Sequence, residues 1–330
     1  MGFRAFVVDN QGDRVGTEVT ELADEELADE PVLIDVAWSA LNFKDTMVVE
    51  ANNRVARRNP LIPGVDLAGT VVESDDPGVA VGSNVLVHGY DLGVAHHGGF
   101  AERARVPAGW VVPLPDGVSP RHAVTVGTAG FTAALSLERL RTNGVRPGGG
   151  PVLVTGASGG VGSMAVSLLA HHGYEVVAST GKEAEHPYLL SLGATTVIGR
   201  NEVMGDKGRV LGKERWAAAV DCVGGETLAA VIRSLRYGGS VAASGLTGGN
   251  AFSSTVYPFI VRGVALLGVD SVLTPIEQRR AVWANVSNDF PEETVATMVA
   301  EEIGLGGIDG ALADLAAAKV RGRVLVEPSR

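Results

Sequence analysis

A glycine-rich segment with spacing suited to phosphate binding runs from Val152 to Gly162, as Val-Leu-Val-Thr-Gly-Ala-Ser-Gly-Gly-Val-Gly. An apolar run ends at a turn of small residues, and a helix-compatible run follows from Val161 to His171. Glycines let the backbone approach a diphosphate, and the N–H groups at a helix start attract it. A second apolar run, 174–180, supplies the strand–helix–strand context that this motif requires. The segment predicts a dinucleotide site that uses Ser158, Gly159, Gly160 and Val161.

The residues after the second strand bear on which dinucleotide is bound. An acid at this place would bind the ribose 2′-hydroxyl of NAD and repel a 2′-phosphate. Here the strand ends in Ser179 and Thr180, followed by Lys182, and hydroxyls with a cation suit a phosphate. Glu183 weakens this argument, whereas Arg200, after the next apolar run, either closes the phosphate pocket or is an exposed charge. We therefore expect NADPH rather than NADH.

Composition limits the class of protein. A chain of 330 residues exceeds one ordinary domain, so two domains are expected. No apolar run approaches the roughly 20 residues of a membrane helix, and no leader pattern opens the chain, which favours a cytoplasmic protein. The single cysteine, Cys222, excludes an intrachain disulfide and a multi-cysteine zinc site. A net charge of −11 argues against nucleic acid or an anionic membrane as partner.

The pattern of apolar runs divides the chain in two. The first ~120 residues are rich in short strands separated by turn residues, whereas strands and helices alternate from Pro151 onward. The six strands expected in the second region fit one doubly wound parallel sheet, an α/β fold. The expected strands are Arg4–Val8, Val32–Val36, Gly69–Glu73, Asn84–Val87, Val152–Thr155, Glu175–Ser179, Thr196–Ile198, Ala217–Asp221, Ser240–Ala243 and Val264–Gly268.

Helical patterns fill the intervals. The tail, with a helix over Ile308–Lys319 and a strand over Gly322–Val326, is too small to fold alone and is expected to return to the N-terminal domain. The acidic run 18–30 is expected to be a solvated loop. The other expected helices are Arg121–Gly130, Ala133–Arg141, Val161–His172, Tyr188–Leu192, Thr227–Leu235 and Pro275–Val286.

Taken together, several short motifs resemble the medium-chain dehydrogenase/reductase superfamily. Beyond the glycine-rich segment they include Leu192-Gly-Ala194 and segments spread from residue 38 to residue 323, so that the resemblance covers nearly the whole chain. Their pattern is similar to the zinc-free quinone-oxidoreductase branch, within it the acrylyl-CoA reductase (YhdH/YhfP-type) group. The remaining matching segments are Trp38–Asp45, Ile62–Gly69, His97–Glu102, Gly127–Thr132, Gly245–Gly249, Gly268–Val272 and Arg321–Arg323.

The resemblance implies a fold and a reaction. The fold is a β-rich GroES-like catalytic domain at 1–123 and 288–330 with a Rossmann domain at 124–287. The reaction is NADPH-dependent reduction of an activated carbon–carbon double bond, with acryloyl-CoA to propionyl-CoA as the named case. The resemblance also implies a homodimer through the edge strand around 264–269. Zinc relatives carry a Cys near position 40 and a His-Glu pair near 65, where this chain has Ala40 and Val65-Asp66, so no metal is expected.

The resemblance also suggests which residues carry the chemistry. Hydride addition to an unsaturated thioester builds an enolate, which needs donors at its oxygen and a proton source for the α-carbon. Asn42 could donate a hydrogen bond, and Asp45 could orient Asn42, Lys44 or a water. The structural alternatives are that Asn42 forms a turn and that Asp45 is a helix N-cap. Phe43 stands where relatives often have a Tyr, whose phenol can hydrogen-bond the cofactor and is a candidate proton donor. With Phe43, either water supplies the proton or the substrate differs. Asp66 either supports the pocket or has a plain turn role. By resemblance the further cofactor-binding residues are Phe43, Thr128, Leu246, Ile260, Ser271 and Arg323.

A basic stretch interrupts this acidic chain at 52–59, between the two segments assigned to the pocket. Arg54, Arg57 and Arg58 could bind the phosphates of coenzyme A, because guanidinium binds phosphate bidentately, or they belong to a solvated loop. Further along the chain, His96 and His97 beside Gly98-Gly99 are expected to be exposed loop histidines rather than catalytic residues.

Three alternative functions deserve comparison. The Thr155–Gly162 segment also matches short-chain dehydrogenases, but these need Tyr-x₃-Lys, and none of the five tyrosines has Lys four residues later. Quinone reduction stays open, because a ring that is already electron-poor needs few protein groups. A non-catalytic NADPH-binding protein also stays open, and NADPH consumption with an enoyl-CoA or a quinone would separate it from an enzyme.

Overall fold

The computed structural model describes residues 2–205 and 209–330. The chain divides into two compact units, Met1–Thr128 with Ser271–Arg330, and Ala129–Asp270. The boundaries expected from sequence were 123/124 and 287/288. The first boundary lies instead at 128/129, because the long helix that begins at Pro120 breaks at Gly127. The second lies at 270/271, because the helical segment after residue 275 packs with the first unit.

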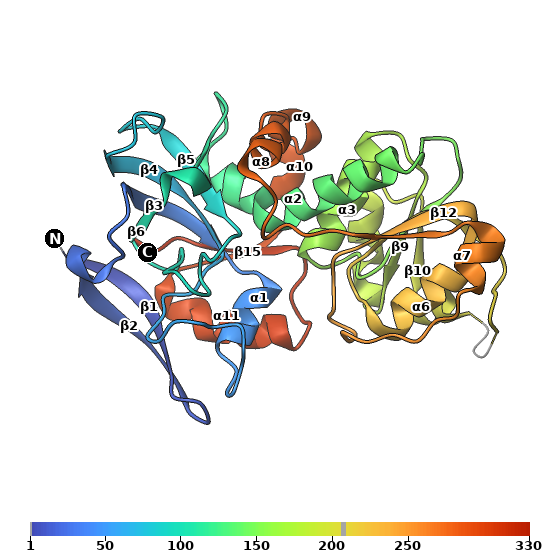
Figure 1. Cartoon of the computed structure of the whole chain (residues 1–330), viewed down its shortest axis with the longest axis horizontal. Helices are drawn as coiled ribbons and strands as arrows, with labels where there is room; N and C mark the ends of the chain where they lie inside the picture. The colour runs from blue at the N-terminus through green and yellow to red at the C-terminus, as the bar shows by residue number, and fades with distance from the viewer. Residues whose placement is uncertain (1, 206–208) are drawn as a thin grey trace. The chain divides into compact units, whose positions relative to one another are not determined.

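The first unit is built on a sheet with strand order β14-β15-β3-β4-β5-β7, in which β6 also pairs with β3. The C-terminal strand β15 lies between β14 and β3, so the end of the chain joins the sheet that the first hundred residues build (Figure 1). The strands are β3 (Val32–Ala40), β4 (Asp66–Ser74), β5 (Asn84–His88), β6 (Arg103–Val106), β7 (Val112–Pro113), β14 (Val299–Ile303) and β15 (Arg323–Val326).

Strand β1 (Gly2–Asn10) pairs antiparallel with β2 (Val15–Ala23) in a separate two-stranded sheet. The acidic run is therefore not the solvated loop expected from its charge: its first half is β2, and its next residues form the short helix η1 (Asp24–Glu26). Leu22 packs against a buried cluster that includes Phe6 and Phe100, while Glu18 and Glu21 face solvent. The apolar contacts on one side of this strand stabilise it, while the acidic side chains on the other side stay in solvent.

Helices complete the first unit. Helix α1 (Phe43–Val48) packs against α11 (Ile308–Ala316), far away in sequence (Figure 1). Helix α2 (Pro120–Thr142) joins the two helices expected separately, with non-helical dihedrals at Gly127. The expected helix 275–286 ends earlier, as α8, and is followed by two short helices that the sequence did not indicate. These helices are α8 (Ile276–Trp283), α9 (Val286–Asp289) and α10 (Glu292–Ala296), with η2 (Ala108–Trp110) and η4 (Leu305–Gly307) elsewhere in the unit.

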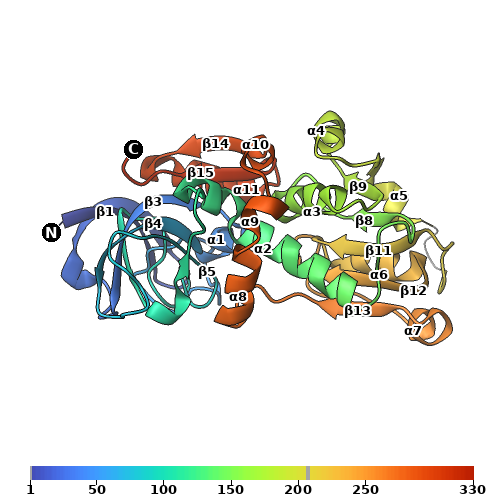
Figure 2. The same ribbon diagram turned by 90° about the horizontal axis from the view of Figure 1, so that it is seen from above.

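The second unit has the expected parallel sheet. Its strand order is β10-β9-β8-β11-β12-β13, the doubly wound order of a Rossmann fold, and every neighbouring pair is parallel (Figure 2). The α/β fold class is thus confirmed. The strands are β8 (Val152–Val154), β9 (Val176–Thr180), β10 (Thr196–Gly199), β11 (Trp216–Asp221), β12 (Leu235–Ala243) and β13 (Ala265–Gly268).

The helices of this unit follow the strands that they connect, as the crossovers of a parallel sheet require. Leu153, Ala219 and Val241 of neighbouring strands are buried in one apolar cluster with Val231 of α6. The helices are α3 (Gly160–His171), η3 (Glu183–Glu185), α4 (His186–Ser191), α5 (Arg200–Met204), α6 (Gly225–Ser234) and α7 (Tyr257–Arg262). Within the described ranges, no helix has both the length and the apolar character that crossing a membrane would demand.

Candidate functional site

The glycine-rich turn after β8 has the geometry of a phosphate cradle. Gly156 has φ +59°, a conformation that favours glycine, and Gly159 precedes the first turn of α3. A Cβ on Gly162 would lie 2.3 Å from the carbonyl oxygen of Gly156, so any side chain here would push the helix away from the turn. The backbone N–H groups at the start of this twelve-residue helix form an anion site of the kind expected for a diphosphate.

The end of β9 brings the predicted phosphate-binding residues together. The hydroxyls of Ser158 and Thr180 lie 3.0 Å apart, and the backbone N–H of Lys182 donates to the Thr180 hydroxyl at 3.1 Å. The guanidinium of Arg200 lies over Gly181, where a Cβ would approach it within 2.1 Å. Partial burial lowers the pKa of Lys182, and Glu185 opposes that shift. Two hydroxyls therefore meet beside the turn, with the Arg200 guanidinium over Gly181 and the Lys182 backbone bonded to Thr180.

Two apolar residues assigned by resemblance lie apart from each other. Leu246 follows the carboxyl end of β12 and is exposed. Ile260 lies on α7, whose last residue, Arg262, donates to the carbonyls of Arg233 and Leu235 where β12 begins. Since the glycine-rich turn is at the carboxyl ends of the strands, the structure does not bring Ile260 to the phosphate cradle.

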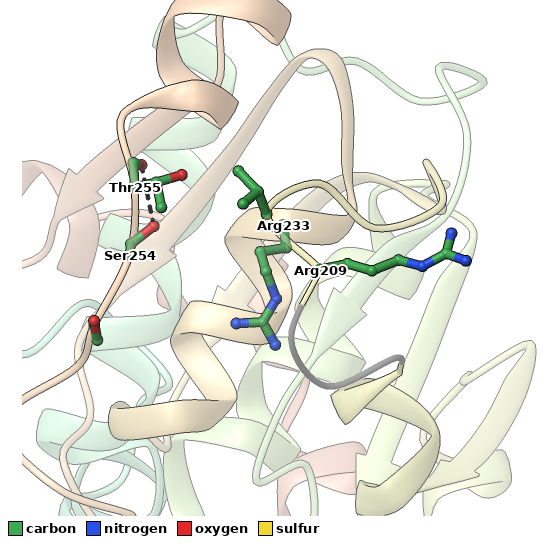
Figure 3. Close-up of a pocket in the computed structure, with 6 residues that line it drawn as sticks. Arg209, Arg233, Ser254 and Thr255 are labelled. Atoms are coloured by element: carbon green, nitrogen blue, oxygen red, sulfur yellow. Dashed lines mark hydrogen bonds between the residues drawn. The ribbon is translucent and has the colours of Figure 1, made fainter.

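A small pocket of about 180 Å³ lies at the same amino-terminal side of the sheet. It is lined by arginine and hydroxyl side chains, but Figure 3 shows that the guanidinium groups of Arg209 and Arg233 point in different directions. Arg233 lies in the last turn of α6, just before β12, so this pocket is separate from the cradle after β8. The other lining residues are Val210, Ser253, Ser254 and Thr255.

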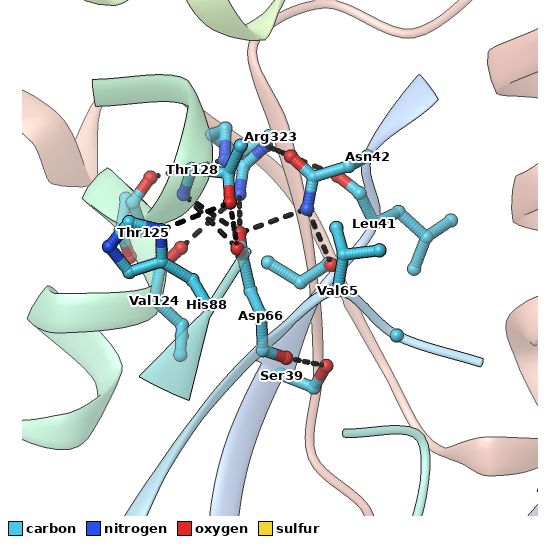
Figure 4. A network of polar contacts seen from close by, with 12 residues as sticks. Ser39, Leu41, Asn42, Val65, Asp66, His88, Val124, Thr125, Thr128 and Arg323 are labelled. Carbon is cyan, nitrogen blue, oxygen red and sulfur yellow. Dashed lines mark hydrogen bonds and ion pairs between the residues drawn. The ribbon is translucent and has the colours of Figure 1, made fainter. Parts of the chain in front are cut away.

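In the first unit, the carboxylate of Asp66 is the centre of a buried polar network (Figure 4). It accepts hydrogen bonds from the Asn42 amide at 2.9 Å, from Arg323 at 3.1 Å, and from both the backbone N–H and the hydroxyl of Thr128 at 3.1 and 2.5 Å. Neither Asp66 nor Arg323 is more than 3% exposed. Asp66 therefore holds the side chains of Asn42, Thr128 and Arg323 in place, and its expected support of a substrate pocket stays a prediction.

The break in α2 makes this network possible. Gly127 has φ +47° and ψ −153°, so the helix opens there, and the Thr128 N–H points to Asp66. A Cβ at residue 127 would lie 2.4 Å from Asp66 Oδ2 and 3.0 Å from the Arg323 guanidinium. Only glycine fits both the dihedral angles and the space.

The structure places Arg323 in the same buried network. Its guanidinium donates to the carbonyls of Leu41, Val124 and Thr125, to the Asn42 side-chain oxygen and to Asp66. These contacts use all five N–H donors that an arginine has, and the side chain is buried. Arg323 thus cross-links these segments through all five of its N–H donors, and its expected contact with the cofactor stays a prediction.

Asn42 is also held more firmly than expected. Its amide nitrogen donates to Asp66 and to the carbonyl of Ala40, and its oxygen accepts from Arg323. Asp45 does not contact this side chain; it accepts from the Asn42 backbone N–H at 2.7 Å and from those of Gly64 and Val65 at 3.2 Å. Asn42, rather than Asp45, is therefore the N-cap residue of α1.

Asp45 has an unusual environment for a carboxylate. Burial raises the pKa of Asp45 to about 7, the backbone N–H groups oppose the shift, and the negative charge of Asp66 adds to it. The side chain joins α1 to the Ile62–Gly69 loop. By contrast, Phe43 at the start of α1 is 37% exposed, so its ring is accessible to a ligand.

Sequence reasoning missed His88, at the end of β5. The Trp283 indole donates to His88 Nε2 at 2.8 Å, the Arg279 guanidinium lies 2.8 Å from Nδ1, and the Thr128 hydroxyl lies 3.4 Å from Nδ1. His88 and Arg279 are fully buried, and burial together with the Arg279 charge holds the pKa of His88 well below its usual range. A histidine directly after an expected strand was the signal that could have found it.

The basic stretch is only partly available for ligands. Arg57 forms an ion pair with Asp91, whereas Arg54 and Arg58 have no ion-pair partner among the residues that the structure describes. Arg58 lies near two imidazoles, and its charge contributes to lowering the pKa of His97 after the larger effect of burial, to about 4. His96 and His97 are 8% and 7% exposed, so the expectation that they are exposed was wrong: the His97 ring accepts the Ile62 N–H, and the His96 ring packs against Trp110.

No group of three or more His, Cys, Asp or Glu side chains is placed to hold a metal ion in residues 2–205 and 209–330. Burial raises the pKa of the Cys222 thiol, which disfavours its reactive thiolate form.

Comparison with known proteins assigns the family. Residues 28–116 match the alcohol dehydrogenase GroES-like domain and residues 160–288 match the zinc-binding dehydrogenase domain. The chain is 43% identical to the acrylyl-CoA reductase AcuI of Ruegeria pomeroyi, over 98% of this chain and 99% of that protein. The chain therefore belongs to the medium-chain dehydrogenase/reductase superfamily. It is an oxidoreductase of this superfamily, in the group that holds quinone oxidoreductases and acrylyl-CoA reductases.

Two further members of the superfamily bear on its function. The chain is 48% identical to YhfP of Bacillus subtilis, named as a quinone oxidoreductase, over 98% of both proteins. A crystal structure of that protein with NAD bound gives a TM-score of 0.95 at 47% identity, covering 99% of both chains. The yhdH oxidoreductase of Salmonella enterica, crystallised with NADP, gives 0.94 at 45% identity over 98% of this chain and 99% of that one.

Proposed function

We propose that this chain is a zinc-independent, NADPH-dependent reductase of an activated carbon–carbon double bond, with acryloyl-CoA to propionyl-CoA as its reaction. The assignment of the substrate rests on the likeness to an acrylyl-CoA reductase, which is 43% identical over 98% of this chain and 99% of that protein. NADPH is supported by the pair of hydroxyls and the cations at the end of β9, and by the likeness to a protein crystallised with NADP.

The glycine-rich turn fits a dinucleotide because Gly162, where a Cβ would lie 2.3 Å from the Gly156 carbonyl oxygen, lets the start of α3 pack closely against the turn. The bound cofactor would supply the hydride for the β-carbon of the substrate. The turn residues would hold the diphosphate with backbone N–H groups, and the second group would hold the 2′-phosphate with hydroxyls and cations. The first group is Ser158, Gly159, Gly160 and Val161, and the second is Ser179, Thr180, Lys182 and Arg200.

For the first unit we propose that Phe43, Thr128 and Ser271 also touch the cofactor, and that Asn42, Asp45 and Asp66 position the catalytic segment. Phe43 is exposed and has no hydroxyl, so the proton for the α-carbon comes from water. Asp45 holds the turn before α1 through backbone N–H groups instead of reaching a ligand. The Asn42 amide is held by Asp66 and Arg323, which keeps the start of α1 in one conformation.

The coenzyme A portion of the substrate would be bound by the basic stretch. Arg58 and Arg54 are the better candidates because Arg57 is neutralised by Asp91. Guanidinium groups bind phosphate bidentately, and the stretch stands in a chain of net charge −11, so it is a local exception to the overall repulsion of an anionic substrate.

Zinc independence is supported by Ala40 and Val65-Asp66 at the positions where zinc relatives have ligands, and by an Asp66 carboxylate already held by Asn42, Thr128 and Arg323. We expect full activity after dialysis against EDTA, with less than one equivalent of any metal per chain by mass spectrometry. Loss of activity together with a stoichiometric metal, and its return with zinc, would refute this part.

A homodimer is proposed through β13, an edge strand of the parallel sheet. Leu266 on this strand and Ile260 and Val261 on the preceding helix are 38%, 72% and 52% exposed, an apolar surface that pairing would cover. Light scattering should give twice the mass of the 34.0 kDa chain. A substitution of Leu266 by Lys should shift the protein toward monomer, whereas a monomeric wild-type protein contradicts the proposal.

The deciding experiment is a substrate panel followed by NADPH absorbance. Acryloyl-CoA should give the highest kcat/KM, ahead of crotonyl-CoA, a small enone and a quinone, with propionyl-CoA as product. Faster turnover of the quinone would favour the second candidate, which rests on the 48% identity to YhfP. NADPH binding without consumption on any of these substrates would favour a non-catalytic NADPH-binding protein.

A further inference from the structure

The side chain of Arg200 begins where two strands of the second unit end. Strands β9 and β10 pair in parallel, with Thr180 opposite Gly199 (Figure 1). The next residues of the two segments, Gly181 and Arg200, therefore lie beside each other at the carboxyl edge of the sheet. Arg200 is the first residue of α5, and the Glu202 carboxylate accepts the Gly199 N–H at 3.0 Å. This bond fixes the backbone from which the Arg200 side chain extends.

Gly181 has no side chain at the place where the Arg200 guanidinium lies. A Cβ at residue 181 would be 2.1 Å from Nη2, 2.4 Å from Nε and 2.5 Å from Cζ of Arg200, and these are the nearest atoms it would meet outside the adjacent residues. Gly181 is not among the glycines with a positive φ, so its backbone conformation admits an alanine. The missing side chain thus provides room for the guanidinium rather than freedom for the backbone.

The Arg200 guanidinium holds no other part of the protein in place. Over residues 2–205 and 209–330 it takes part in no hydrogen bond or ion pair, and Glu183, an acid three residues after Thr180, does not pair with it. By contrast, Arg262 of the same unit donates to three backbone carbonyls. An arginine side chain has five N–H donors, and those of Arg200 are therefore available to a ligand.

The strand end that carries Gly181 adjoins the glycine-rich turn. The Ala157 N–H donates to the Ser179 carbonyl at 3.0 Å, and the hydroxyls of Ser158 and Thr180 lie 3.0 Å apart. In dinucleotide-binding folds the ribose next to adenine is bound near this position, and a nearby arginine accommodates a 2′-phosphate. The guanidinium beside Gly181 is thus a free cation on the side of the turn where a 2′-phosphate is expected.

We infer that Gly181 is a specificity-determining residue: because it has no side chain, the Arg200 guanidinium stays at the end of β9 and binds the 2′-phosphate of NADPH. A side chain at residue 181 turns the guanidinium away without unfolding the protein, since the group that must move is the end of a long, exposed side chain. The inference rests on the proposed preference for NADPH over NADH, and its test separates the two.

The test is a double-mutant cycle, read by calorimetric binding of NADPH and NADH. Arg200→Ala should weaken NADPH binding by roughly tenfold to a hundredfold, the loss of one charge-assisted phosphate contact, and Gly181→Ala by about fivefold to tenfold, because the guanidinium is displaced but kept. NADH has no 2′-phosphate and should bind both variants as it binds wild type. In the Arg200→Ala background, Gly181→Ala should change neither affinity, because the group through which it acts is gone.

The dependence on salt is a second measurement, which a merely structural role would not change. Adenosine 2′,5′-bisphosphate and adenosine 5′-monophosphate allow the comparison without the nicotinamide half of the cofactor. Wild-type protein should prefer the bisphosphate, and more strongly at low ionic strength. Gly181→Ala should reduce both the preference and its dependence on salt.

Gly199→Ala is the matched control. It lies one residue before Arg200, at the end of the neighbouring strand, and a new Cβ there would meet only the Glu202 carboxylate, at 3.9 Å. It should leave the preference for NADPH unchanged. Urea unfolding should give Gly181→Ala the same midpoint as wild type, so that a change in affinity is not a loss of folded protein.

Three results would overturn the inference. Gly181→Ala could leave the preference for NADPH intact, could weaken NADPH and NADH equally, or could act as strongly in the Arg200→Ala background. The last result would mean that residue 181 acts through another group, such as the neighbouring Lys182. Wild-type protein that binds NADPH no more tightly than NADH would refute the proposed preference and the inference with it, whereas a wild-type preference that survives in Gly181→Ala refutes the inference alone.

Discussion

Thr128 donates two hydrogen bonds to the same carboxylate, that of Asp66: one from its backbone N–H and one from its hydroxyl. The backbone bond exists only because α2 opens at the preceding residue, and the carboxylate is in turn fixed by Arg323 and Asn42. A helix break and a buried ion pair thus position one partly exposed threonine.

The helix break gives the first prediction. Gly127→Ala should destabilise the protein by about 3 kcal/mol or more, because the alanine would meet Asp66 and Arg323 and would have to adopt a φ of +47°. Urea unfolding measures the change. Gly310→Ala, at an exposed helix position with open space around the new Cβ, is the control and should be neutral or stabilising. Equal stability of wild type and Gly127→Ala would mean that the break is not required.

The cofactor preference gives the second prediction. Lys182→Ala should raise the Michaelis constant for NADPH by roughly tenfold to a hundredfold, the effect of losing a charge-assisted phosphate contact, and should leave NADH nearly unchanged. Lys213→Ala is the control, since Lys213 is an exposed lysine of the same unit outside the cluster. Equal use of NADPH and NADH by the wild-type enzyme would contradict the assignment.

The substrate contact gives the third prediction. Arg58→Ala should raise the Michaelis constant for an acyl-CoA more than Arg57→Ala does, because Arg57 already pairs with Asp91, and the effect should grow at low ionic strength. Activity on a small uncharged enone should not change. Arg14→Ala, an exposed arginine in the turn between β1 and β2, serves as the control. A similar loss of activity on the acyl-CoA and on the enone would mean that the arginines have a structural role or are simply solvated.

The fourth prediction concerns pH. The pKa of Asp45 is raised to about 7 in the folded protein, from 3.8 for an unperturbed carboxyl, so between these values the folded state binds the proton that the unfolded state has lost. Stability must then fall as pH rises through this window, by at most about 1.4 kcal/mol per pH unit, and level off above it.

Asp45→Asn removes the titrating group and also an acceptor for backbone N–H groups. It should be less stable than wild type near pH 4, and the difference should narrow as pH rises toward 7. Urea unfolding of both proteins between pH 4 and pH 7 measures this difference in stability. Parallel pH profiles would show that Asp45 titrates normally in the folded state.

Local sequence determined much of the second unit. The turn after β8 and the six parallel strands follow from short-range patterns, because a buried parallel strand needs a continuous apolar run and a phosphate cradle needs glycines at fixed spacing. Ser179, Thr180 and Lys182 were located in the same way, since the first two end one of those strands and Lys182 follows it closely.

What only the tertiary structure decided is which polar groups of the first unit are used up by the protein. Asp66, Thr128, Arg323 and His88 are separated by tens to hundreds of residues, and no local pattern links them. Arg323 was expected to bind the cofactor by resemblance alone, and only the structure shows that its five donors also join Asp66, Asn42 and three backbone carbonyls. Likewise β2 formed from an acidic stretch, and His96 and His97 are buried, because burial depends on what the rest of the chain packs against them. Residue types and spacing specify local conformation and chemical capacity, whereas the free donors and acceptors of a site are set by long-range packing.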